Sequence, residues 1–203
     1  MEVEVISFND WKILKSQVDR YQVVVTVSRS TDWGVGLSPF KLGPCALWGD
    51  NISATMENAW QFSKVYPEYT NNEVVNMDLW LAWAKKGWAD TRAHRYPVGK
   101  GRKPLYSYWD GEQYGYIEAR KKIYIPLYWN AVRVVPAFRQ LLTRYNELKS
   151  QNKDLYLVDF DAYRHKRMGY SYRDVINDER MTMGHAFVLA MALEEAPELD
   201  EII

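Results

Sequence analysis

Three polar side chains suited to catalysis follow one another at helical spacing in the segment ATMENAWQFSKVY, residues 54–66. Glu57, Gln61 and Lys64 occupy positions i, i+4 and i+7 of a predicted helix, so they share one face. On a helical wheel this polar stripe borders the apolar stripe around Met56, whereas most amphipathic helices place their charges opposite the core. Such side chains can enter the edge of a cleft and act on a ligand. They can also form an ordinary flanking face with local pairing, which the spacing alone favours.

A second pair of candidate residues ends the segment DLYLVDFD (154–161), which predicts a strand. Asp159 and Asp161 are two residues apart, so on a strand they point to the same face. Paired carboxylates can hold a divalent metal or a nucleotide sugar, as in D-x-D glycosyltransferases. The D-x-D pattern is common, and a solvated strand end is its more frequent origin.

A basic stretch between residues 91 and 108 carries no acidic side chain and interleaves its cations with His and Tyr. Its candidate nucleic-acid contacts are Arg92, Arg95, Arg102 and Lys103, which can bind phosphates without reading base sequence. A solvated loop is the alternative interpretation. The whole chain has 26 basic and 26 acidic side chains, so attraction to a polynucleotide must come from a local patch of this kind.

Several other chemistries are excluded by the residues that the chain lacks. A single cysteine, Cys45, allows no internal disulfide and no cysteine-based zinc site. The three histidines lack H-E-x-x-H spacing, and the glycines at 34 and 36 lack the third glycine of a dinucleotide fingerprint. The chain also has no P-loop and no G-x-S-x-G elbow. We therefore expect neither a metal nor a cofactor.

The elements that must position these residues predict an α+β fold, mainly helical, with a small β-sheet. Strands are expected at 22–27 and 154–161. Helices are expected near residues 8–21, 54–66, 77–88, 116–151, after 171, and 183–196. The first should be capped near Asn9, and Pro126 and Pro136 should each lie near a helix start.

The expected organisation is a single domain covering residues 1–203, because this length suffices for one substantial core. The acidic tail, 195–203, is expected to fray. The start MEVEVISFNDW has neither the basic residues nor the apolar run of a signal peptide, and the longest apolar run, 186–193, is too short to span a bilayer. With the single cysteine, these features predict a cytoplasmic protein that does not enter a membrane.

The segment Thr55–Val65 resembles the signature of the NADAR family, whose helix reads roughly T-S-E-H-x-x-Q-x-x-K-[FY]. Thr55, Glu57, Gln61 and Lys64 all fall in register with it. The upstream segment LSPFKLG resembles the latter half of the family's S-N-F-x-P-x-P-F-x-x-x-G loop. The order of a strand, an acidic residue and a glycine before a final apolar helix is also similar.

Three departures accompany the resemblance. Asn58 stands where the family has His, and AYRH (162–165) stands where it has a Trp-Gly pair. Gly184, His185 and Ala186 stand for its G-x-N. These departures motivate an alternative, a catalytically inactive module that binds a nucleotide or a nucleic acid.

The resemblance implies a NADAR-like fold and hydrolysis of an N-glycosidic bond. The substrate implied first is ADP-ribosylated guanine in DNA, and a small riboflavin-pathway ribotide also fits. Glu57 would stabilise positive charge on the sugar or activate water. Lys64 would act as an amine nucleophile on a ring-opened sugar, and Gln61 would hold a sugar hydroxyl. Asp161 is a further catalytic candidate.

The remaining candidates are ligand-binding residues. Arg29 and Lys41 could hold a diphosphate, with Gly34 and Gly36 allowing close backbone approach. Three tryptophans could stack on a base, and for each of them core packing is the alternative: Trp33, Trp48 and Trp60. Asn58 and His185 complete the set, and a lone histidine on an apolar helix is more often a core residue.

Three functions remain open from the sequence: the N-glycosidase, the inactive binding module, and a D-x-D nucleotide-sugar transferase that needs a divalent metal. The first requires that the 28–44 loop, the 55–65 helix and the end of the 154–161 strand converge on one cleft, and we predict that they do.

Overall fold

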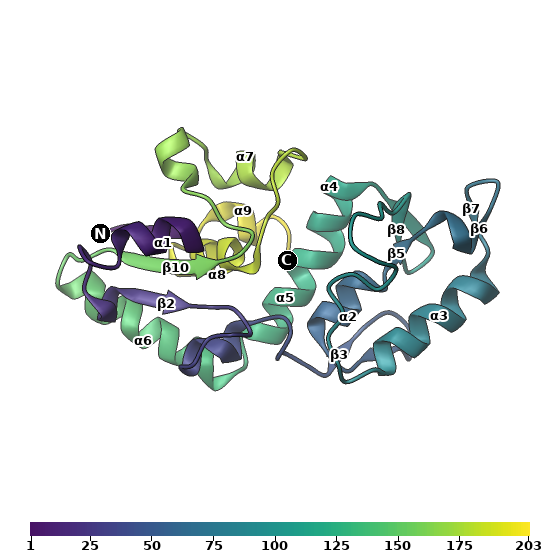
Figure 1. The fold of residues 1–203 in the computed structure, drawn as a ribbon, viewed down its shortest axis with the longest axis horizontal. Coiled ribbons are helices and arrows are strands. Elements are labelled where there is room, and N and C mark those ends of the chain that lie inside the picture. Colours follow the sequence, from purple (N-terminus) through teal and green to yellow (C-terminus); the bar gives the residue numbers. More distant parts are fainter. The chain divides into compact units, whose positions relative to one another are not determined.

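The computed structural model describes all residues from Met1 to Ile203. It contains 45% helix and 15% strand, and the strands form four small sheets. The predicted fold class, mainly helical α+β, is therefore confirmed. The chain divides into two compact units (Figure 1). Unit 1 comprises residues 1–38 and 132–203, and unit 2 comprises residues 39–131. No helix combines the length and the apolar character that crossing a membrane requires.

Unit 1 is built on a three-stranded parallel sheet with the order β1-β10-β2. The strands are β1 (Val3–Ser7), β10 (Leu155–Asp159) and β2 (Val23–Val25). The central strand β10 is the buried apolar run predicted at 154–161, and it ends two residues earlier than expected. β2 lies within the predicted segment 22–27. The pattern did not predict β1, although four of its five residues are buried.

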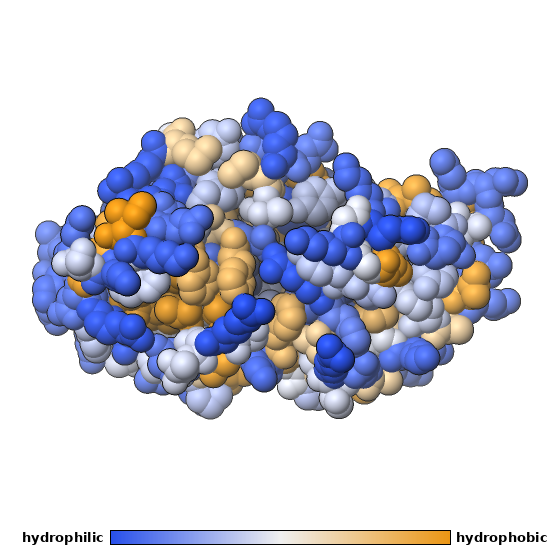
Figure 2. All heavy atoms as spheres, viewed as in Figure 1, coloured by the Kyte–Doolittle hydropathy of each residue, from blue (hydrophilic) through white to orange (hydrophobic).

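The helices of unit 1 cover this sheet. α1 (Phe8–Leu14) packs on the face that carries Ile6 and Val158, and α8 (His185–Leu193) also contacts β1 and β10. On the face of unit 1 shown in Figure 2, apolar side chains gather between α1 and α6, in the region of β2. The remaining elements are η1 (Arg20–Gln22), η2 (Trp33–Leu37), α6 (Pro136–Ser150), η5 (His165–Met168), α7 (Tyr172–Asn177) and α9 (Pro197–Asp200).

The helix ends test the predicted caps. α1 is capped by Ser7 and not near Asn9, because the Ser7 hydroxyl and the Asp10 carboxylate form a reciprocal capping box. The Ser171 start of α7 is confirmed by a second capping box with Asp174. In the tail expected to fray, α9 forms instead, because its Leu199 is buried and anchors the segment.

Unit 2 is built around α3 (Met77–Ala89), which confirms the helix predicted at 77–88. Its buried Trp80, Ala84 and Trp88 form one apolar cluster with Phe62 and Val65. The sheet β5-β8-β9 is antiparallel. Its strands and those of the two hairpins are β5 (Lys64–Val65), β8 (Tyr106–Trp109), β9 (Glu112–Tyr114), β3 (Cys45–Ala46), β4 (Ile52–Ser53), β6 (Thr70–Asn71) and β7 (Val74–Val75).

The other helical elements of unit 2 are α2 (Met56–Gln61), η3 (Pro67–Tyr69), α4 (Tyr116–Ala119), the π-helical turn η4 (Arg120–Tyr124) and the beginning of α5 (Ile125–Val132). Pro126 is the second residue of α5 and Pro136 is the first residue of α6, so each lies near a helix start as predicted. The start of α5 follows directly on the π-helical turn η4.

Candidate active site

The helix α2 presents the residues of the signature segment. Its N-terminal cap is Thr55, whose hydroxyl accepts the N–H of Asn58 at 3.1 Å. The helix ends at Gln61, because Phe62 turns into the apolar cluster under α3. Gly87 permits this approach, since a Cβ at that position would lie 2.0 Å from the Phe62 ring.

Lys64 lies on strand β5 and not on the predicted helix, which ends three residues before it. Strand pairing displaces helical continuation here: Lys64 pairs with Ser107 of β8, and Tyr108 N–H donates to the carbonyl oxygen of Ser63 at 2.8 Å. The indole of Trp80 also donates to the Lys64 carbonyl oxygen at 3.1 Å. The Lys64 backbone is therefore fixed by contacts from residues far away in the sequence.

The three polar side chains of the signature meet despite this break in the helix. Gln61 Nε2 donates to Glu57 Oε1 at 2.9 Å, and Lys64 Nζ donates to Gln61 Oε1 at 2.7 Å. A carboxylate only accepts and an ammonium only donates, so the orientation of the Gln61 amide follows from its partners. Glu57, Gln61 and Lys64 form one continuous hydrogen-bonded chain, which we call the α2–β5 relay.

The relay is largely removed from water. Glu57 is 5% exposed and Gln61 is 8% exposed. Lys64 Nζ lies 4.8 Å from the ring centroid of Trp60, which packs in turn against Tyr124. Burial lowers the pKa of Lys64 to about 8, with Glu57 opposing this shift and Arg95 adding to it. At pH 7 about a tenth of the Lys64 amines are then neutral.

This geometry can perform two kinds of chemistry. A buried carboxylate stabilises nearby positive charge more strongly than an exposed one, because water screens it less. An amine with a pKa near 8 can act as a nucleophile or as a proton carrier at physiological pH. The α2–β5 relay holds both groups at a fixed separation through Gln61.

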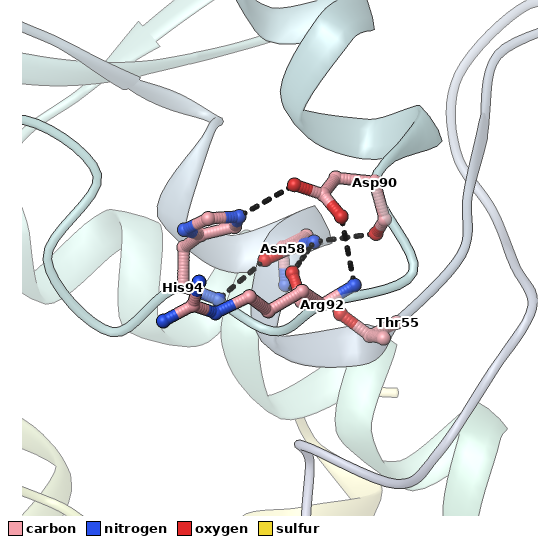
Figure 3. Close-up of polar contacts among 5 residues, drawn as sticks. All are labelled: Thr55, Asn58, Asp90, Arg92 and His94. Carbon is pink, nitrogen blue, oxygen red and sulfur yellow. Dashed lines mark hydrogen bonds and ion pairs between the residues drawn. The ribbon is translucent and has the colours of Figure 1, made fainter.

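Asn58 was expected among the ligand-binding residues, but its contacts are with the backbone of unit 2 (Figure 3). Its side-chain nitrogen donates to the carbonyl oxygens of Asp90 and Arg92 at 2.8 and 2.9 Å, and its oxygen accepts the N–H of His94 at 2.8 Å. Asn58 is completely buried. Its side chain fastens residues 90–94 to α2, which accounts for its polar atoms without a ligand.

The basic stretch is held at both ends. Asn58 fixes its start, and the N–H of Leu105 donates to the carbonyl oxygen of Val65 at 2.8 Å near its end. Between these points Arg102 pairs with Glu68 at 2.9 Å, while Lys103 is exposed. Arg92 is exposed as well, and Arg95 lies over the ring of Tyr96.

The two units carry opposite net charges, which the balanced total conceals. Unit 2 contains twelve Lys and Arg against nine Asp and Glu, and unit 1 contains fourteen against seventeen. Unit 2, which contains the basic stretch, therefore has a net charge of plus three, and unit 1 has minus three. The attraction to polyanions that the whole chain lacks is available locally in unit 2.

A buried carboxylate of unit 1, Asp159, lies at the end of β10. It accepts the N–H groups of Phe160 and Ala186, and its Oδ2 lies 3.1 Å from Nδ1 of His185. Burial alone would raise the pKa of Asp159, but His185 and the two amides outweigh it, so the pKa lies below its usual value. His185 Nε2 lies 2.9 Å from the carbonyl oxygen of Thr26, so both ring nitrogens face acceptors.

These contacts correct the predicted D-x-D face. β10 ends at Asp159, so Asp159 and Asp161 do not share a strand. The Asp159 carboxylate is directed at His185 and the start of α8, and the Asp161 carbonyl oxygen accepts the N–H of Gly184 at 2.9 Å. No three His, Cys, Asp or Glu side chains gather in a group that could hold a metal ion. The D-x-D transferase therefore loses the geometry on which it depended.

Gly34 and Gly36 of the 28–44 loop are required for packing inside unit 1. A Cβ at Gly34 would lie 2.4 Å from the Val25 carbonyl oxygen, and one at Gly36 would lie 2.9 Å from the Ala137 side chain. Trp33 lies under the guanidinium of Arg144, whose carbon is 5.0 Å from the indole centroid.

The other predicted ligand contacts lie in different surroundings. Arg29 is exposed, 6.0 Å from the Phe160 ring centroid, and Lys41 is exposed in unit 2. Trp48 packs edge-on against Trp88 and belongs to the aromatic core of unit 2. The convergence of loop, helix and strand end on one cleft involves both units and stays a prediction.

Two contributors to the site have no local signal in the sequence. Tyr124 supports Trp60 from a distance of more than 60 positions. Arg95 was expected to bind phosphate, and its effect on Lys64 follows only from the folded chain. A contact of this kind has no periodicity, so pattern analysis of one sequence cannot find it.

No protein-family model matches the chain, and no curated protein matches it. The resemblance to the NADAR family therefore rests on the signature residues themselves.

Proposed function

We propose that the protein is an N-glycosidase that removes ADP-ribose from guanine bases in DNA, with Glu57 and Lys64 as its catalytic residues. The observation that carries the proposal is the α2–β5 relay. It joins the two residues that the NADAR resemblance singles out, although one is on a helix and the other on a strand.

Glu57 would act on the charge that develops during the reaction. Breaking a base–ribose bond builds positive charge at the anomeric carbon of the sugar. A buried carboxylate stabilises that charge, and it can also accept a proton from an attacking water. Overall, one water molecule is consumed, the guanine nitrogen gains a proton and the anomeric carbon gains a hydroxyl group.

Lys64 would provide a covalent route to the same products. After the ribose ring opens, the neutral amine replaces the base nitrogen at the anomeric carbon and forms an imine, which water then hydrolyses to return the amine. The pKa of about 8 supports this role, because a neutral lone pair is available in a useful fraction of molecules at pH 7.

The basic stretch supports a polynucleotide as the carrier of the modified base. Its ends are fastened to α2 and β5, the elements that form the relay. Arg92 and Lys103 are exposed for contact with phosphates.

The test measures release of ADP-ribose from a guanine-modified oligonucleotide, with and without a chelator. Glu57→Gln keeps size and hydrogen bonding, and Lys64→Met keeps length and apolar contacts. Each single variant should lower the rate on the order of 10²-fold or more, and the double variant should add little, because groups that act as a unit are non-additive. Lys85→Met, which removes an exposed lysine of the same unit with no proposed role, is the matched control and should keep full activity.

The outcomes separate the roles. Full activity in Glu57→Gln would remove that residue from the mechanism. A borohydride-trapped adduct present in the wild type and missing in Lys64→Met supports the imine, whereas activity without any adduct favours direct attack by water. Faster release from a modified mononucleotide than from DNA would favour a small ribotide substrate.

A second candidate function, an inactive nucleic-acid-binding module, is favoured by Asn58, which replaces the histidine of the family signature and serves the backbone. Binding of modified DNA without release of ADP-ribose would select it.

A further inference from the structure

Asn58 links two features of unit 2 that are separate in the sequence, the α2–β5 relay and the start of the basic stretch. It follows Glu57 directly in α2. Both hydrogens of its side-chain amide are used by the carbonyl oxygens of Asp90 and Arg92, and its oxygen accepts the N–H of His94 (Figure 3). These three bonds, together with complete burial, fix the backbone of residues 90–94 against the helix.

The same turn is closed from its outer side. Asp90 accepts the N–H of Arg92 at 2.8 Å, and its other oxygen lies 2.7 Å from His94 Nε2. The His94 ring also packs edge-on against Phe62. The backbone that leads into residue 95 is therefore held from two sides.

Arg95 directly follows this turn, and its charge lowers the pKa of Lys64. The pKa of Lys64 is lowered first by burial and further by Arg95, with Glu57 acting in the opposite direction. Arg95 is one residue beyond the His94 N–H that Asn58 holds, and its guanidinium lies 5.6 Å from the ring centroid of Tyr96. Displacing the turn would therefore displace this charge.

We propose that Asn58 is a positioning residue, whose side-chain amide fastens residues 90–94 to α2 and so keeps the Arg95 guanidinium within electrostatic reach of the Lys64 amine. Each polar contact described for its side chain goes to the backbone of residues 90–94, so it acts through Arg95. The proposal rests on the proposed function and deepens it, because it names a charge that adds to burial in keeping the candidate nucleophile partly neutral.

The experiment titrates Lys64 in the intact protein without any substrate. Lysine labelled with ¹³C at Cε gives one NMR signal per residue, and the Lys64 signal is the one missing from Lys64→Arg. Arg95→Gln should raise the Lys64 titration midpoint by on the order of half a pH unit, the size expected from one nearby charge in a protein-like dielectric. Asn58→Ala should raise it in the same direction.

The double variant makes the test specific. If Asn58 acts through Arg95, then Asn58→Ala added to Arg95→Gln should shift the midpoint little further. A shift from Asn58→Ala that is just as large without Arg95 would overturn the proposal, and so would no shift at all in a folded Asn58→Ala protein. Faster hydrogen exchange of the His94 amide should accompany the shift.

A matched control separates positioning from stability. Asn76→Ala removes the N-terminal cap of α3, where Asn76 accepts the N–H of Leu79. It is the same substitution in the same unit and should leave the Lys64 midpoint unchanged. If Asn58→Ala does not fold, Asp90→Ala loosens the same turn from its partly exposed side, and it should shift the midpoint upward by a smaller amount; no shift in that variant would overturn the proposal.

This result is independent of the enzymatic assay. Loss of ADP-ribose release in every condition, with the expected midpoint shifts intact, would reject the proposed reaction and keep the positioning role of Asn58. Unshifted midpoints with activity preserved would do the reverse.

Discussion

Two buried networks of charged side chains, one in each unit, differ in their partners. In unit 1, the carboxylate of Asp159 and the imidazole of His185 face each other and direct their other polar atoms to the backbone. In unit 2, Glu57 and Lys64 are separated by the neutral side chain of Gln61.

The difference supports a structural role for the network of unit 1 and agrees with the proposed reactive role of the network of unit 2. We call them the structural and the reactive network. Backbone groups cannot exchange partners without unfolding the elements that carry them, so the network of Asp159 and His185 supports the start of α8. A side-chain amide and the face of Trp60 are partners that a ligand can replace. The low pKa of Lys64 agrees with this. An ammonium group whose charge was fully compensated by its neighbours would have a pKa closer to its usual value.

The largest expected effect tests the structural network. Asp159→Ala should lower the free energy of unfolding by about 3 kcal/mol, because it leaves buried amides and a buried imidazole without their acceptor. Chemical denaturation measures this. The control Asp154→Ala, at the other end of β10, loses one exposed hydrogen bond from Glu2 and should cost less than about 1 kcal/mol.

The pH dependence of folding stability in acid provides a second test of Asp159. The folded-state pKa of Asp159 lies below its usual value, so its stabilising contribution is complete above the unfolded value and disappears as the pH falls through the folded one. The wild type should therefore lose its advantage over Asp159→Ala below about pH 4. An advantage that stays constant down to pH 2 would contradict this assignment.

The second effect tests the reactive network through the pH dependence of stability. The pKa of Lys64 falls from 10.5 to about 8 in the folded state. Between these values the unfolded chain binds a proton that the folded chain does not, so folding stability rises with pH in this window. Relative to Lys64→Met, the wild type should gain at most about 3 kcal/mol between pH 8 and 10.5.

The control for this measurement is Lys41→Met, which removes an exposed lysine from the same unit. Its stability difference from the wild type should stay flat across the same window. A flat difference for Lys64→Met as well would mean that the Lys64 amine is solvated, and the relay would then have no reactive member.

The sequence predicted which residues form the reactive network better than it predicted the secondary structure that carries them. The positions of Glu57, Gln61 and Lys64 indicated a shared face, and the side chains do meet. The helix that was to align them stops at Gln61, because pairing of β5 with β8 and the approach of Phe62 to Gly87 come from distant segments. Local propensity carries no information about such partners.

The prediction for the residues of the structural network was wrong for a related reason. Asp159 and Asp161 were expected to share a strand face, and His185 was weighed as a ligand or a core residue. Its pairing with Asp159 depends on the parallel register of β10 and on the position of α8, which bring residues 159 and 185 together. Apolar elements such as α3 and β10 were predicted well, because the pattern of their apolar residues in the sequence indicates which side chains are buried.

The third effect uses the opposite charges of the two units. Replacing Arg92, Arg95, Arg102 and Lys103 by Ala should weaken DNA binding uniformly across sequences and reduce the slope of log affinity against log salt by up to about 4. Fluorescence anisotropy with labelled oligonucleotides over a salt series measures both. Because Arg102 already pairs with Glu68, its own share should be smaller than that of the exposed Arg92 or Lys103.

The matched control removes four exposed cations from unit 1, which are Lys12, Lys15, Lys153 and Arg167. It changes the net charge of the chain by the same amount. Equal losses in the two variants would mean that total charge governs binding, and the basic stretch would then be only a solvated loop.

The smallest expected effect concerns the middle member of the relay. Gln61→Met fills a similar volume but removes both hydrogen bonds, leaving Glu57 and Lys64 in place without their bridge. Stability should fall by about 1–2 kcal/mol, because two buried polar contacts are lost. The rate of ADP-ribose release should fall only about tenfold, since both proposed catalytic groups remain and lose only their alignment.

A second variant of the same residue, Gln61→Glu, tests the titration of Lys64. A second carboxylate next to Lys64 should raise the pKa of its amine, so the pH–rate profile should move to higher pH. A Gln61→Glu profile identical to that of the wild type would show that Lys64 does not supply the titrating group, and the reactive network would reduce to Glu57 alone.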